Sequence, residues 1–427
     1  MFSIYNKENV GLLMTKLKER AENVGDEIEK IVRTIIADVR KRGDEALFEY
    51  GEKFDRVKLE SLYVSEAEKN EALKKLSPEL KEAMDRAAAN IYDFHARQKQ
   101  QSWIDNRNGR IMGQRVLPLR RVGLYVPGGS AAYPSSVLMN AIPAKVAGVE
   151  SIVMFTPPKS EGINPAVIYA AKLAGVTDIV AVGGAQAVAA MAYGTESIER
   201  VDKIVGPGNI FVATAKRLVF GAVDIDMFAG PSEVLVIADE NADPAYVAAD
   251  FMSQAEHDPM AASILITTSE KLVNEVQDEV KRQMSYLSRA DIIEKSLTTY
   301  GSAVVVDTLD EAASISDEIA PEHLELMVDN PFELLGKVKN AGSVFLGKNS
   351  PEPLGDYYAG PNHVLPTNGT ARFSSALSTD SFVKRSSYLY YSEEALSASA
   401  DDIIRFAKAE GLTAHANSIE IRVKKDI

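Results

Sequence analysis

The sequence contains no cysteine, and this absence excludes several kinds of chemistry. Disulfide bonds, thiolate metal ligands and a cysteine nucleophile cannot occur in such a chain. Long hydrophobic runs are also missing, since no stretch approaches the roughly 18 apolar residues of a membrane-spanning helix. Met1–Val10 lack the basic and then apolar residues of a signal peptide. We therefore expect a soluble, cytoplasmic protein without membrane contact.

An excess of positive charge is missing as well. Lysine and arginine number 47 against 61 aspartate and glutamate residues, which gives a net charge of −14. Nucleic acids and anionic membranes attract positive surfaces, so we expect neither as a partner. With 427 residues, the chain exceeds the length that one hydrophobic core usually organises, and we expect two or more domains.

The hydrophobic pattern divides the chain into a helical beginning and an alternating remainder. From about residue 8 to 93, apolar residues recur with helical spacing, as at Ile28, Ile31, Val32 and Ile35. The remainder alternates short β-branched runs with alanine-rich helical segments, which is typical of parallel βαβ units. The fold class predicted is therefore α/β. Strands are predicted at residues 122–126, 151–155, 178–182, 203–205, 234–238, 263–267, 303–306 and 343–345.

Helices are predicted between these strands and near the end of the chain. The segments concerned are residues 165–174, 186–193, 271–284, 331–339 and 401–409. After Ser350 the chain becomes loop-like, and a final strand is predicted at residues 418–423.

Four glycine-rich stretches adjoin predicted strands, at residues 126–130, 182–186, 205–209 and 229–232. Glycine lets the backbone approach a ligand, and a following helix offers free N–H groups to phosphate. None matches G-x-G-x-x-G, and each alone could be an ordinary turn. If the four strands share one sheet, the stretches could together form a ligand-binding edge.

Of five histidines, four lie in short polar clusters after Asp250, while His95 is interpreted as a surface or packing residue. In Ser253–Asp258, Gln254 and His257 are expected to share one helix face and could bind a metal, although a solvent-facing polar helix would have the same pattern. In Pro321–Glu325 a carboxylate adjoins an imidazole, two groups suited to proton transfer, although such pairs also occur at helix starts without function.

Two later segments add further candidates. Leu354–His363 is interrupted by glycine and proline yet carries an aspartate, a histidine and two tyrosines, so a functional loop is favoured over a linker. Glu410–Asn417 adds an acid and an imidazole, although a helix end capped at Gly411 explains the same residues. The metal-ligand candidates are Gln254, His257, Asp356 and His415. Zinc fits these nitrogen and oxygen ligands best, with manganese and cobalt as alternatives.

The polar clusters, in this order, closely resemble the histidinol dehydrogenase family. They are Ser-Gln-Ala-Glu-His-Asp, Pro-Glu-His-Leu, Gly-Asp-Tyr followed by Asn-His, and Leu-Thr-Ala-His. Val-Pro-Gly-Gly, Gly-Gly-Ala-Gln, Gly-Pro-Gly-Asn and Gly-Pro-Ser-Glu match the family as well. The resemblance covers Val116–Val423, whereas the first hundred residues carry no signature of their own.

The resemblance implies an enzyme that oxidises L-histidinol through histidinal to L-histidine with NAD, the last step of histidine biosynthesis. It implies one zinc per subunit on Gln254, His257, Asp356 and His415, and proton transfer by Glu322 and His323. NAD would contact Tyr125, Gln186 and Asn209. Histidinol would contact the four metal ligands and His323, together with Ser232, His363 and Glu410.

The family fold implied has two Rossmann-like domains, one inserted in the other, with small N-terminal helical and C-terminal pieces. Its expected parts are a helical segment at residues 1–21, a domain with the metal and catalytic residues at 22–124 and 233–377, an NAD-binding domain at 125–232, and a dimerisation segment at 378–427. In a homodimer of this kind, the partner subunit would donate Glu410 and His415 to the active site.

The missing cysteine bears on the mechanism, because an aldehyde must gain an oxygen nucleophile before a second hydride can leave. Without a thiol, water must add to the aldehyde to form a hydrate, with Glu322 activating that water and His323 taking the hydroxyl proton. A zinc hydrolase would also explain the ligands but would leave the glycine-rich stretches unused. A ligand-binding protein would share the α/β layout but would bind histidinol without turnover.

Overall fold

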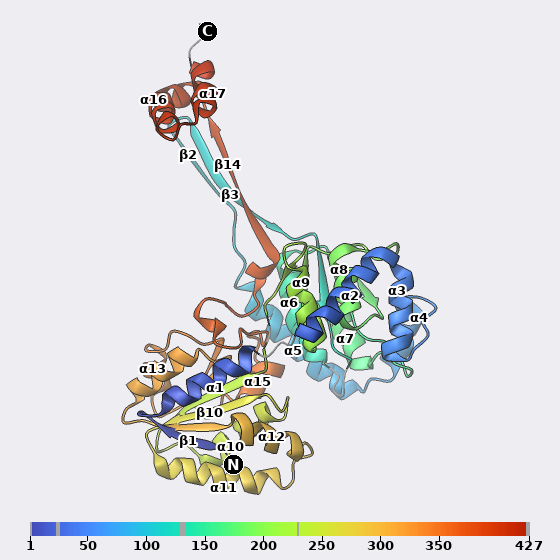
Figure 1. The fold of residues 1–427 in the computed structure, drawn as a ribbon, viewed down its shortest axis with the longest axis vertical. Helices are drawn as coiled ribbons and strands as arrows, with labels where there is room; N and C mark the ends of the chain where they lie inside the picture. The colour runs from blue at the N-terminus through green and yellow to red at the C-terminus, as the bar shows by residue number, and fades with distance from the viewer. Residues whose placement is uncertain (1, 23–25, 129–132, 229, 424–427) are drawn as a thin grey trace. The chain divides into compact units, whose positions relative to one another are not determined.

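The computed structural model describes residues 2–22, 26–128, 133–228 and 230–423 (Figure 1). It divides into two compact units. The first comprises Met1–Gln98 and Leu119–Phe382, and the second comprises Lys99–Pro118 and Val383–Ile427. No described helix is both long and apolar enough to cross a membrane.

The first unit contains a six-stranded parallel sheet, here called sheet A, in the order β1-β11-β10-β9-β12-β13. Its strands are β1 (Ser3–Asn6), β9 (Glu233–Ala238), β10 (Ala262–Thr267), β11 (Ser302–Val305), β12 (His323–Met327) and β13 (Ser343–Leu346). On one side of β9 lie β10 and then β11, and on the other side lie β12 and then β13. The strands therefore follow in chain order outward from β9 in both directions. This reversal is the Rossmann-like arrangement.

A second parallel sheet in the same unit, sheet B, has the order β6-β5-β4-β7-β8. Its strands are β4 (Arg121–Tyr125), β5 (Ser151–Phe155), β6 (Asp178–Val180), β7 (Lys203–Val205) and β8 (Asp224–Ile225). Its order reverses at β4 as that of sheet A does at β9. Because sheet B lies in sequence between β1 and β9, one Rossmann-like sheet is inserted in the other, which confirms the predicted fold class.

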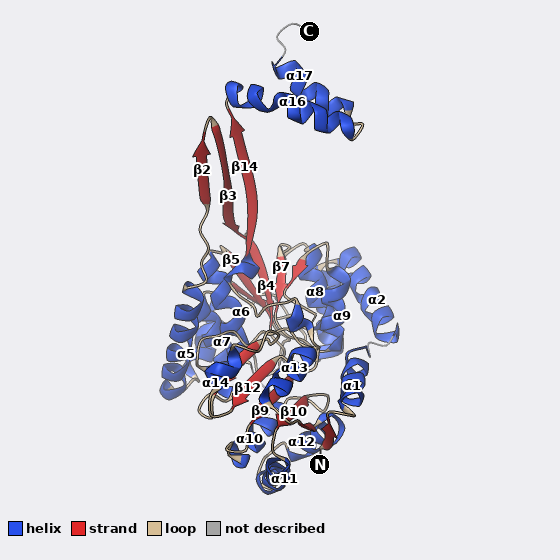
Figure 2. Cartoon of the chain, turned by 90° about the vertical axis from the view of Figure 1, so that its left-hand side faces the viewer, coloured by secondary structure: helices blue, strands red, loops and turns tan. Residues whose placement is uncertain are grey.

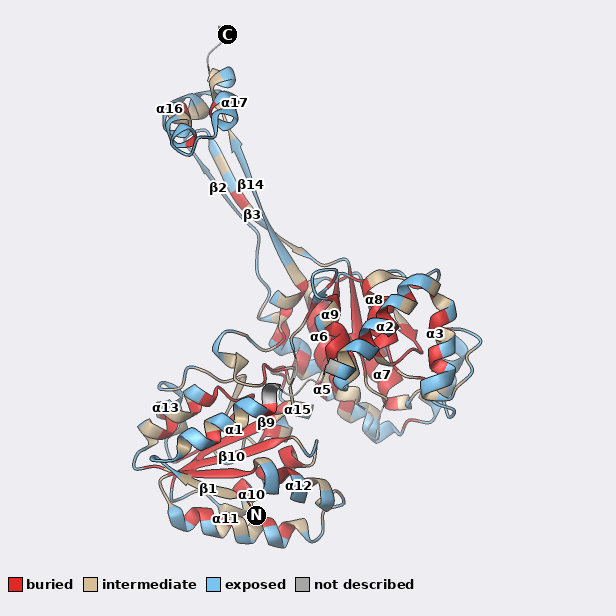
Figure 3. Cartoon of the chain, viewed as in Figure 1, coloured by how far each residue is buried: buried red, intermediate tan, exposed pale blue. Residues whose placement is uncertain are grey.

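Helices cover both faces of both sheets, and the central strands are buried (Figure 3). Those of the first unit are α1 (Val10–Glu22), α2 (Asp26–Arg42), α3 (Asp44–Tyr50), α4 (Glu66–Lys74), α5 (Pro78–Ala96), α6 (Pro134–Ala147), α7 (Pro165–Ala174), α8 (Gly184–Tyr193), α9 (Ile210–Val219), α10 (Pro244–Ala255), α11 (Glu270–Met284), α12 (Ala290–Tyr300), α13 (Leu309–Ile319), α14 (Pro331–Leu335) and α15 (Glu352–Tyr357). A π-helical turn, η1 (Gly51–Asp55), follows α3, and 3-10 turns lie at η2 (Thr370–Arg372) and η3 (Thr379–Phe382).

Local sequence signals define both ends of α7. The Asn164 side chain accepts the Ala166 N–H, Pro165 occupies the first turn of α7, and Gly175 ends the helix at φ 76°. Proline at a first turn loses no hydrogen bond there, and glycine adopts positive φ without a Cβ clash. This helix was predicted at the same residues.

The N-terminal helices differ from expectation in the sheet that they cover. Residues 22–124 were expected to belong with the metal and catalytic domain. Instead, Val32 and Leu47 pack with residues of sheet B, and Ile91 packs against its other face. Only the first segment joins sheet A, where Leu13 of α1 is fully buried and β1 pairs with β11. Residues 1–21 therefore contain a strand as well as a helix.

The second unit contains an antiparallel sheet in the order β14-β3-β2 and two helices (Figure 2). Its elements are β2 (Trp103–Arg107), β3 (Arg110–Pro118), β14 (Val383–Tyr391), α16 (Glu393–Ala409) and α17 (Thr413–Val423). Residues 99–118 thus join the C-terminal segment rather than either Rossmann-like sheet. The strand predicted at residues 418–423 is wrong: these residues lie in α17, which an ion pair of 2.8 Å from Lys408 to Glu420 joins to α16.

Candidate active site

Glu322 and His323 lie at the amino end of β12, next to the amino end of β9. The sequence of this pair is also compatible with a helix start, but His323 is the first residue of a strand. The Glu233 N–H donates to Glu322 Oε2 at 2.9 Å, and the Glu233 carbonyl lies 3.1 Å from His323 Nδ1. One residue of the neighbouring strand therefore contacts both members of the pair through its backbone.

These contacts define which nitrogen of His323 can accept a proton. Nδ1 must donate to the Glu233 carbonyl, because a carbonyl oxygen can only accept. In the neutral ring, Nε2 is then the acceptor. Nε2 is buried without a hydrogen-bond partner among the described residues, and it lies 3.9 Å from Asp356 Oδ1. The imidazole is thus held by one nitrogen and free at the other.

Burial shifts both pKa values of this pair toward neutral side chains. It raises the pKa of Glu322 well above its ordinary value, although the hydrogen bond from Glu233 opposes the rise. Burial also lowers the pKa of His323, so that the ring is a neutral base at neutral pH. Paired groups shifted in this way are suited to proton transfer.

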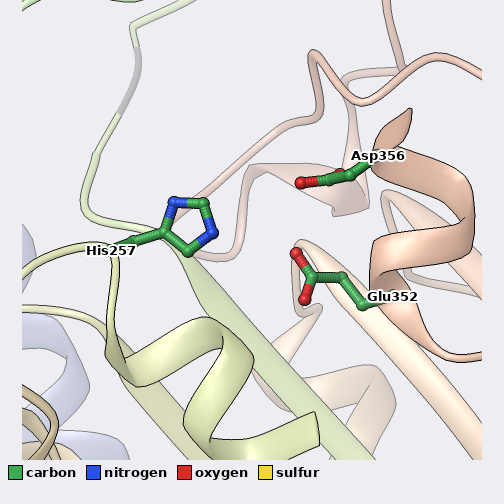
Figure 4. Close-up of side chains that lie close together, drawn as sticks. All are labelled: His257, Glu352 and Asp356. Atoms are coloured by element: carbon green, nitrogen blue, oxygen red, sulfur yellow. The ribbon is translucent and has the colours of Figure 1, made fainter. Parts of the chain in front are cut away.

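A possible metal group lies beside this pair. Ligand atoms of His257, Glu352 and Asp356 all lie within 4.8 Å of one another. His257 follows the end of α10, whereas Glu352 and Asp356 both come from α15 and point toward it (Figure 4). One imidazole and two carboxylates form a nitrogen and oxygen set that suits zinc or manganese.

Gln254 lies in the last turn of α10, with 1% of its surface exposed. Its Oε1 has no hydrogen-bond partner among the described residues, so a buried acceptor is left available. Gln254 and His257 were expected to share one helix face. The helix α10 ends at Ala255, and His257 lies exposed in the turn that follows, where its N–H donates to the Gln254 carbonyl at 3.2 Å.

Asp356 connects the metal group with two histidines. The Nδ1 atom of His363 lies 3.1 Å from the backbone carbonyl oxygen of Asp356 and 3.7 Å from Oδ1 of the Asp356 side chain. Burial lowers the pKa of His363, as it does for His323. Leu354–His363 was predicted as a loop, but its first part belongs to α15, which places Asp356 one turn after Glu352. Ser232 directly precedes Glu233, at the same end of sheet A.

A buried carboxyl pair lies behind the metal group. Burial raises the pKa of Asp250 to about 6 and that of Glu325 well above its ordinary value, and the two side chains are hydrogen-bonded. Glu325 Oε1 also accepts the Glu352 N–H at 2.8 Å, and Ser253 donates to Glu352 Oε2 at 2.9 Å. The pair therefore joins α10, β12 and α15, which carry the candidate site.

Because the pKa of Asp250 is raised, we expect the protein to lose stability as pH rises. Asp250 has an ordinary pKa near 4 when unfolded and about 6 when folded, so the folded state binds more protons between these values. The free energy of unfolding should then fall as pH rises from about 4 to 6, by roughly 3 kcal/mol for this group. Urea unfolding at pH 4.5 and 7 should show a smaller difference for Asp250→Asn than for the unchanged protein. An equal difference in both proteins would contradict the assignment.

The candidate cofactor residues lie at the carboxyl edge of sheet B. Tyr125 ends β4, Gln186 is in the first turn of α8, and Asn209 caps α9 after β7. A ligand-binding crevice is expected between β4 and β7, where the strand order reverses. Tyr125 Oη accepts the Gly184 N–H at 3.0 Å, and Asn209 Oδ1 accepts two N–H groups of α9. These side chains thus also shape the edge itself.

Gly206 lets the turn after β7 approach β4 closely. It has φ 108°, and a Cβ there would lie 2.2 Å from the Tyr125 carbonyl oxygen. A buried ion pair between Lys216 and Asp226 supports the same turn: Lys216 donates to the Gly206 carbonyl at 2.9 Å, and Asp226 accepts the Gly206 N–H at 2.7 Å. A side chain at Gly206 cannot be accommodated.

The four glycine-rich stretches do not share one sheet. Those at residues 126–128, 182–186 and 205–209 follow β4, β6 and β7 of sheet B, whereas residues 230–232 precede β9 of sheet A. Gly129, Ser130 and Ala229 lie outside the described residues.

Two predicted site residues belong to the second unit. His415 lies in α17, Glu410 caps α16, and both are exposed there. Their participation in the site stays a prediction. His95, in contrast, is fully buried in the first unit, 2.7 Å from Gln98 and 3.2 Å from Asn362, and is a packing residue as interpreted.

Two important residues were missed in the sequence. Glu352 precedes Asp356 by four residues, a spacing that places both on one helix face, but the prolines and glycine of this segment concealed the helix. Glu233 was hidden because its contacts with Glu322 and His323 run through the backbone, for which side-chain type gives no signal.

Two Rossmann-like sheets and a buried acid–base pair beside possible metal ligands define an α/β enzyme. Comparison with known proteins identifies its family. The histidinol dehydrogenase family model matches residues 18–423. A histidinol dehydrogenase from Clostridium acetobutylicum is 57% identical over 410 residues, which cover 96% of this chain and 95% of that protein. One from Caldanaerobacter subterraneus subsp. tengcongensis is 56% identical over 428 residues, covering 100% and 99%.

One solved structure gives the same result. The crystal structure of histidinol dehydrogenase from Elizabethkingia anophelis matches with a TM-score of 0.94 and 40% identity, covering 99% of this chain and 98% of that chain. The chain belongs to the histidinol dehydrogenase family. It is an oxidoreductase with the function of a histidinol dehydrogenase in histidine biosynthesis.

Proposed function

We propose that the enzyme oxidises L-histidinol to L-histidine through histidinal, using two NAD and one zinc ion per subunit, as the last step of histidine biosynthesis. The observation that carries this proposal is the arrangement of His323, with Nδ1 held by the Glu233 carbonyl and Nε2 buried without a partner. Such a nitrogen can accept a proton from a bound alcohol. Purified protein should form NADH with histidinol, and saturable binding without NADH would contradict the proposal.

In the first half-reaction, His323 Nε2 takes the hydroxyl proton while hydride leaves the adjacent carbon. In the second, water adds to histidinal, and Glu322 accepts the proton of that water. After releasing its first proton to water, His323 takes a hydroxyl proton of the hydrate as the second hydride leaves. The chain has no cysteine that could form a thiohemiacetal instead.

The residues present fit both groups that this reaction needs. Gln254 Oε1 is a buried acceptor without a described partner, and with His257, Asp356 and His415 it would hold the metal, beside Glu352. The carboxyl edge with Tyr125, Gln186 and Asn209 would hold NAD. When bound, NAD accepts hydride and the metal anchors the amine and imidazole of histidinol.

A homodimer is part of the proposal, with Glu410 and His415 supplied to the partner's site. Its support is a set of exposed apolar side chains in the second unit. The exposed large apolar residues of this unit are Trp103, Ile104, Met112, Tyr388, Leu389, Tyr390, Ile403, Phe406, Leu412 and Ile421. Exposed apolar residues at this density favour a protein interface.

Metal removal provides a direct test. A strong chelator should abolish NADH formation, and zinc should restore it. His257→Ala should lose zinc and activity together, because a methyl group cannot replace an imidazole ligand. Full activity of metal-free protein would contradict the metal assignment.

Glu352 can be tested by metal affinity alone. If its carboxylate assists the metal, Glu352→Gln should weaken zinc binding by about tenfold or more, a typical effect of residues around a metal site. The matched control is Glu256→Gln, which changes a carboxylate directly beside His257 and should leave the affinity within about twofold. Competition titration with a chromogenic chelator measures both, and equal affinities would exclude Glu352.

A further inference from the structure

The Glu233 side chain is tied to the N-terminal helix α1 by a buried ion pair. Arg20 Nη2 donates to Glu233 Oε1 at 2.7 Å, and the two side chains are 1% and 5% exposed. The same Oε1 accepts the Asn368 N–H at 2.8 Å. Arg20 also donates to the carbonyls of Pro231 at 3.1 Å and Met260 at 3.3 Å. The guanidinium thus holds the segments that lead into β9 and β10.

We infer that Arg20 is a positioning residue for the reaction, acting through Glu233 on Glu322 and His323; this inference rests on the proposed function. The Arg20 guanidinium fixes the Glu233 side chain, and the backbone of Glu233 holds both members of the acid–base pair, at 2.9 and 3.1 Å. The chain of contacts runs from α1 to the reacting groups without a gap. The first twenty residues therefore serve catalysis although none of them belongs to the site.

The chemistry of the ion pair between Arg20 and Glu233 explains why its loss should move the catalytic side chains. A buried carboxylate that loses its cation must take up a proton or turn toward water. Burial already raises the pKa of Glu233, and the positive charge of Arg20 opposes that rise. If Glu233 turns, its peptide group moves, and the hydrogen bonds to Glu322 and His323 lengthen. A displacement of about 1 Å can lower a rate by roughly a hundredfold.

Lysine should replace Arg20 only in part. Arginine presents several N–H donors in a planar fork, whereas lysine presents one compact charge. Arg20 uses its donors on Glu233 and on two carbonyls of separate segments. Arg20→Lys keeps the charge opposite Glu233 but cannot reach all these acceptors, so it should restore part of what Arg20→Met loses.

The experiment compares full-length, zinc-loaded variants at a temperature where circular dichroism shows them folded. For Arg20→Met we expect kcat with histidinol to fall by about tenfold to a hundredfold, with KM within about twofold, because the proposed metal ligands, which would anchor histidinol, do not depend on this ion pair. The histidinal half-reaction should fall by a similar factor, since Glu233 holds both catalytic residues. Arg20→Lys should lie between Arg20→Met and the unchanged protein.

The matched control is Lys203→Met, which removes another buried cation, paired with Asp224 at 2.8 Å at the amino end of β7. It should lower the melting temperature without changing kcat. If Arg20→Met does not fold, Glu233→Gln replaces it, because the amide keeps the size but loses the charge attraction, and kcat should again fall at constant KM.

The outcomes separate the two proposals. A folded Arg20→Met protein with kcat within twofold of the unchanged protein, or a loss equal to that of Lys203→Met, would overturn the positioning role. Absence of NADH formation in the unchanged protein would instead overturn the proposed function.

Discussion

Glu322→Gln should lower the oxidation of histidinal by about 10²- to 10⁴-fold, the range expected for loss of a general base. Oxidation of histidinol to histidinal should fall far less, because that half-reaction needs no activated water. The amide keeps the shape of the carboxyl and can still approach the Glu233 N–H, which now contacts Oε2 at 2.9 Å. The loss is therefore one of basicity rather than of packing.

Separate assays of NADH formation from histidinol and from histidinal measure this difference. The control Glu318→Gln changes an exposed carboxylate at the end of α13 and should leave both rates unchanged. Equal losses in the two half-reactions would contradict the division of roles between Glu322 and His323.

The pH dependence of histidinal oxidation provides an independent test of the role of Glu322. Burial raises the pKa of Glu322 well above its ordinary value, and the carboxyl can accept a proton only when ionised. Histidinal oxidation should therefore increase as pH rises through that raised pKa, above the usual carboxyl range. The Glu322→Gln protein should lack this acidic limb.

The sequence was sufficient for the elements whose periodicity is strong. The strands at 151–155 and 203–205 and the helix at 165–174 lie where they were predicted, because short apolar runs and helix caps are local signals. The prediction of a final strand was wrong because contacts between distant residues, and not local signals, determine the structure there. Alternating Ile419, Ile421 and Val423 favour a strand, yet contact with α16 stabilises a helix there. Tertiary contacts outweigh such propensities.

For the site, the sequence indicated residue types but not their positions in space. Glu322 and His323 were recognised as a proton-transfer pair, while the strand that holds them and the Glu233 backbone beside them could not be predicted. Glu352 and Arg20 depend on contacts between segments far apart in the chain, from α10 to α15 and from α1 to β9. A single sequence contains no signal for such contacts.

Whether His415 acts within its own chain is decided by mixing two inactive proteins. His323→Ala and His415→Ala should each be inactive, the first through loss of the base and the second through loss of a metal ligand. If the partner supplies Glu410 and His415, a mixed dimer has one site with both changes and one site with neither. That second site should work.

After unfolding and random reassociation, about half of the dimers should be mixed, so that roughly a quarter of the unchanged protein's activity returns. Each variant treated alone is the control and should recover nothing. Native mass spectrometry should confirm that mixed dimers have formed. If they form without activity, His415 belongs to the site of its own chain, because the only site free of both changes requires that histidine to come from the partner.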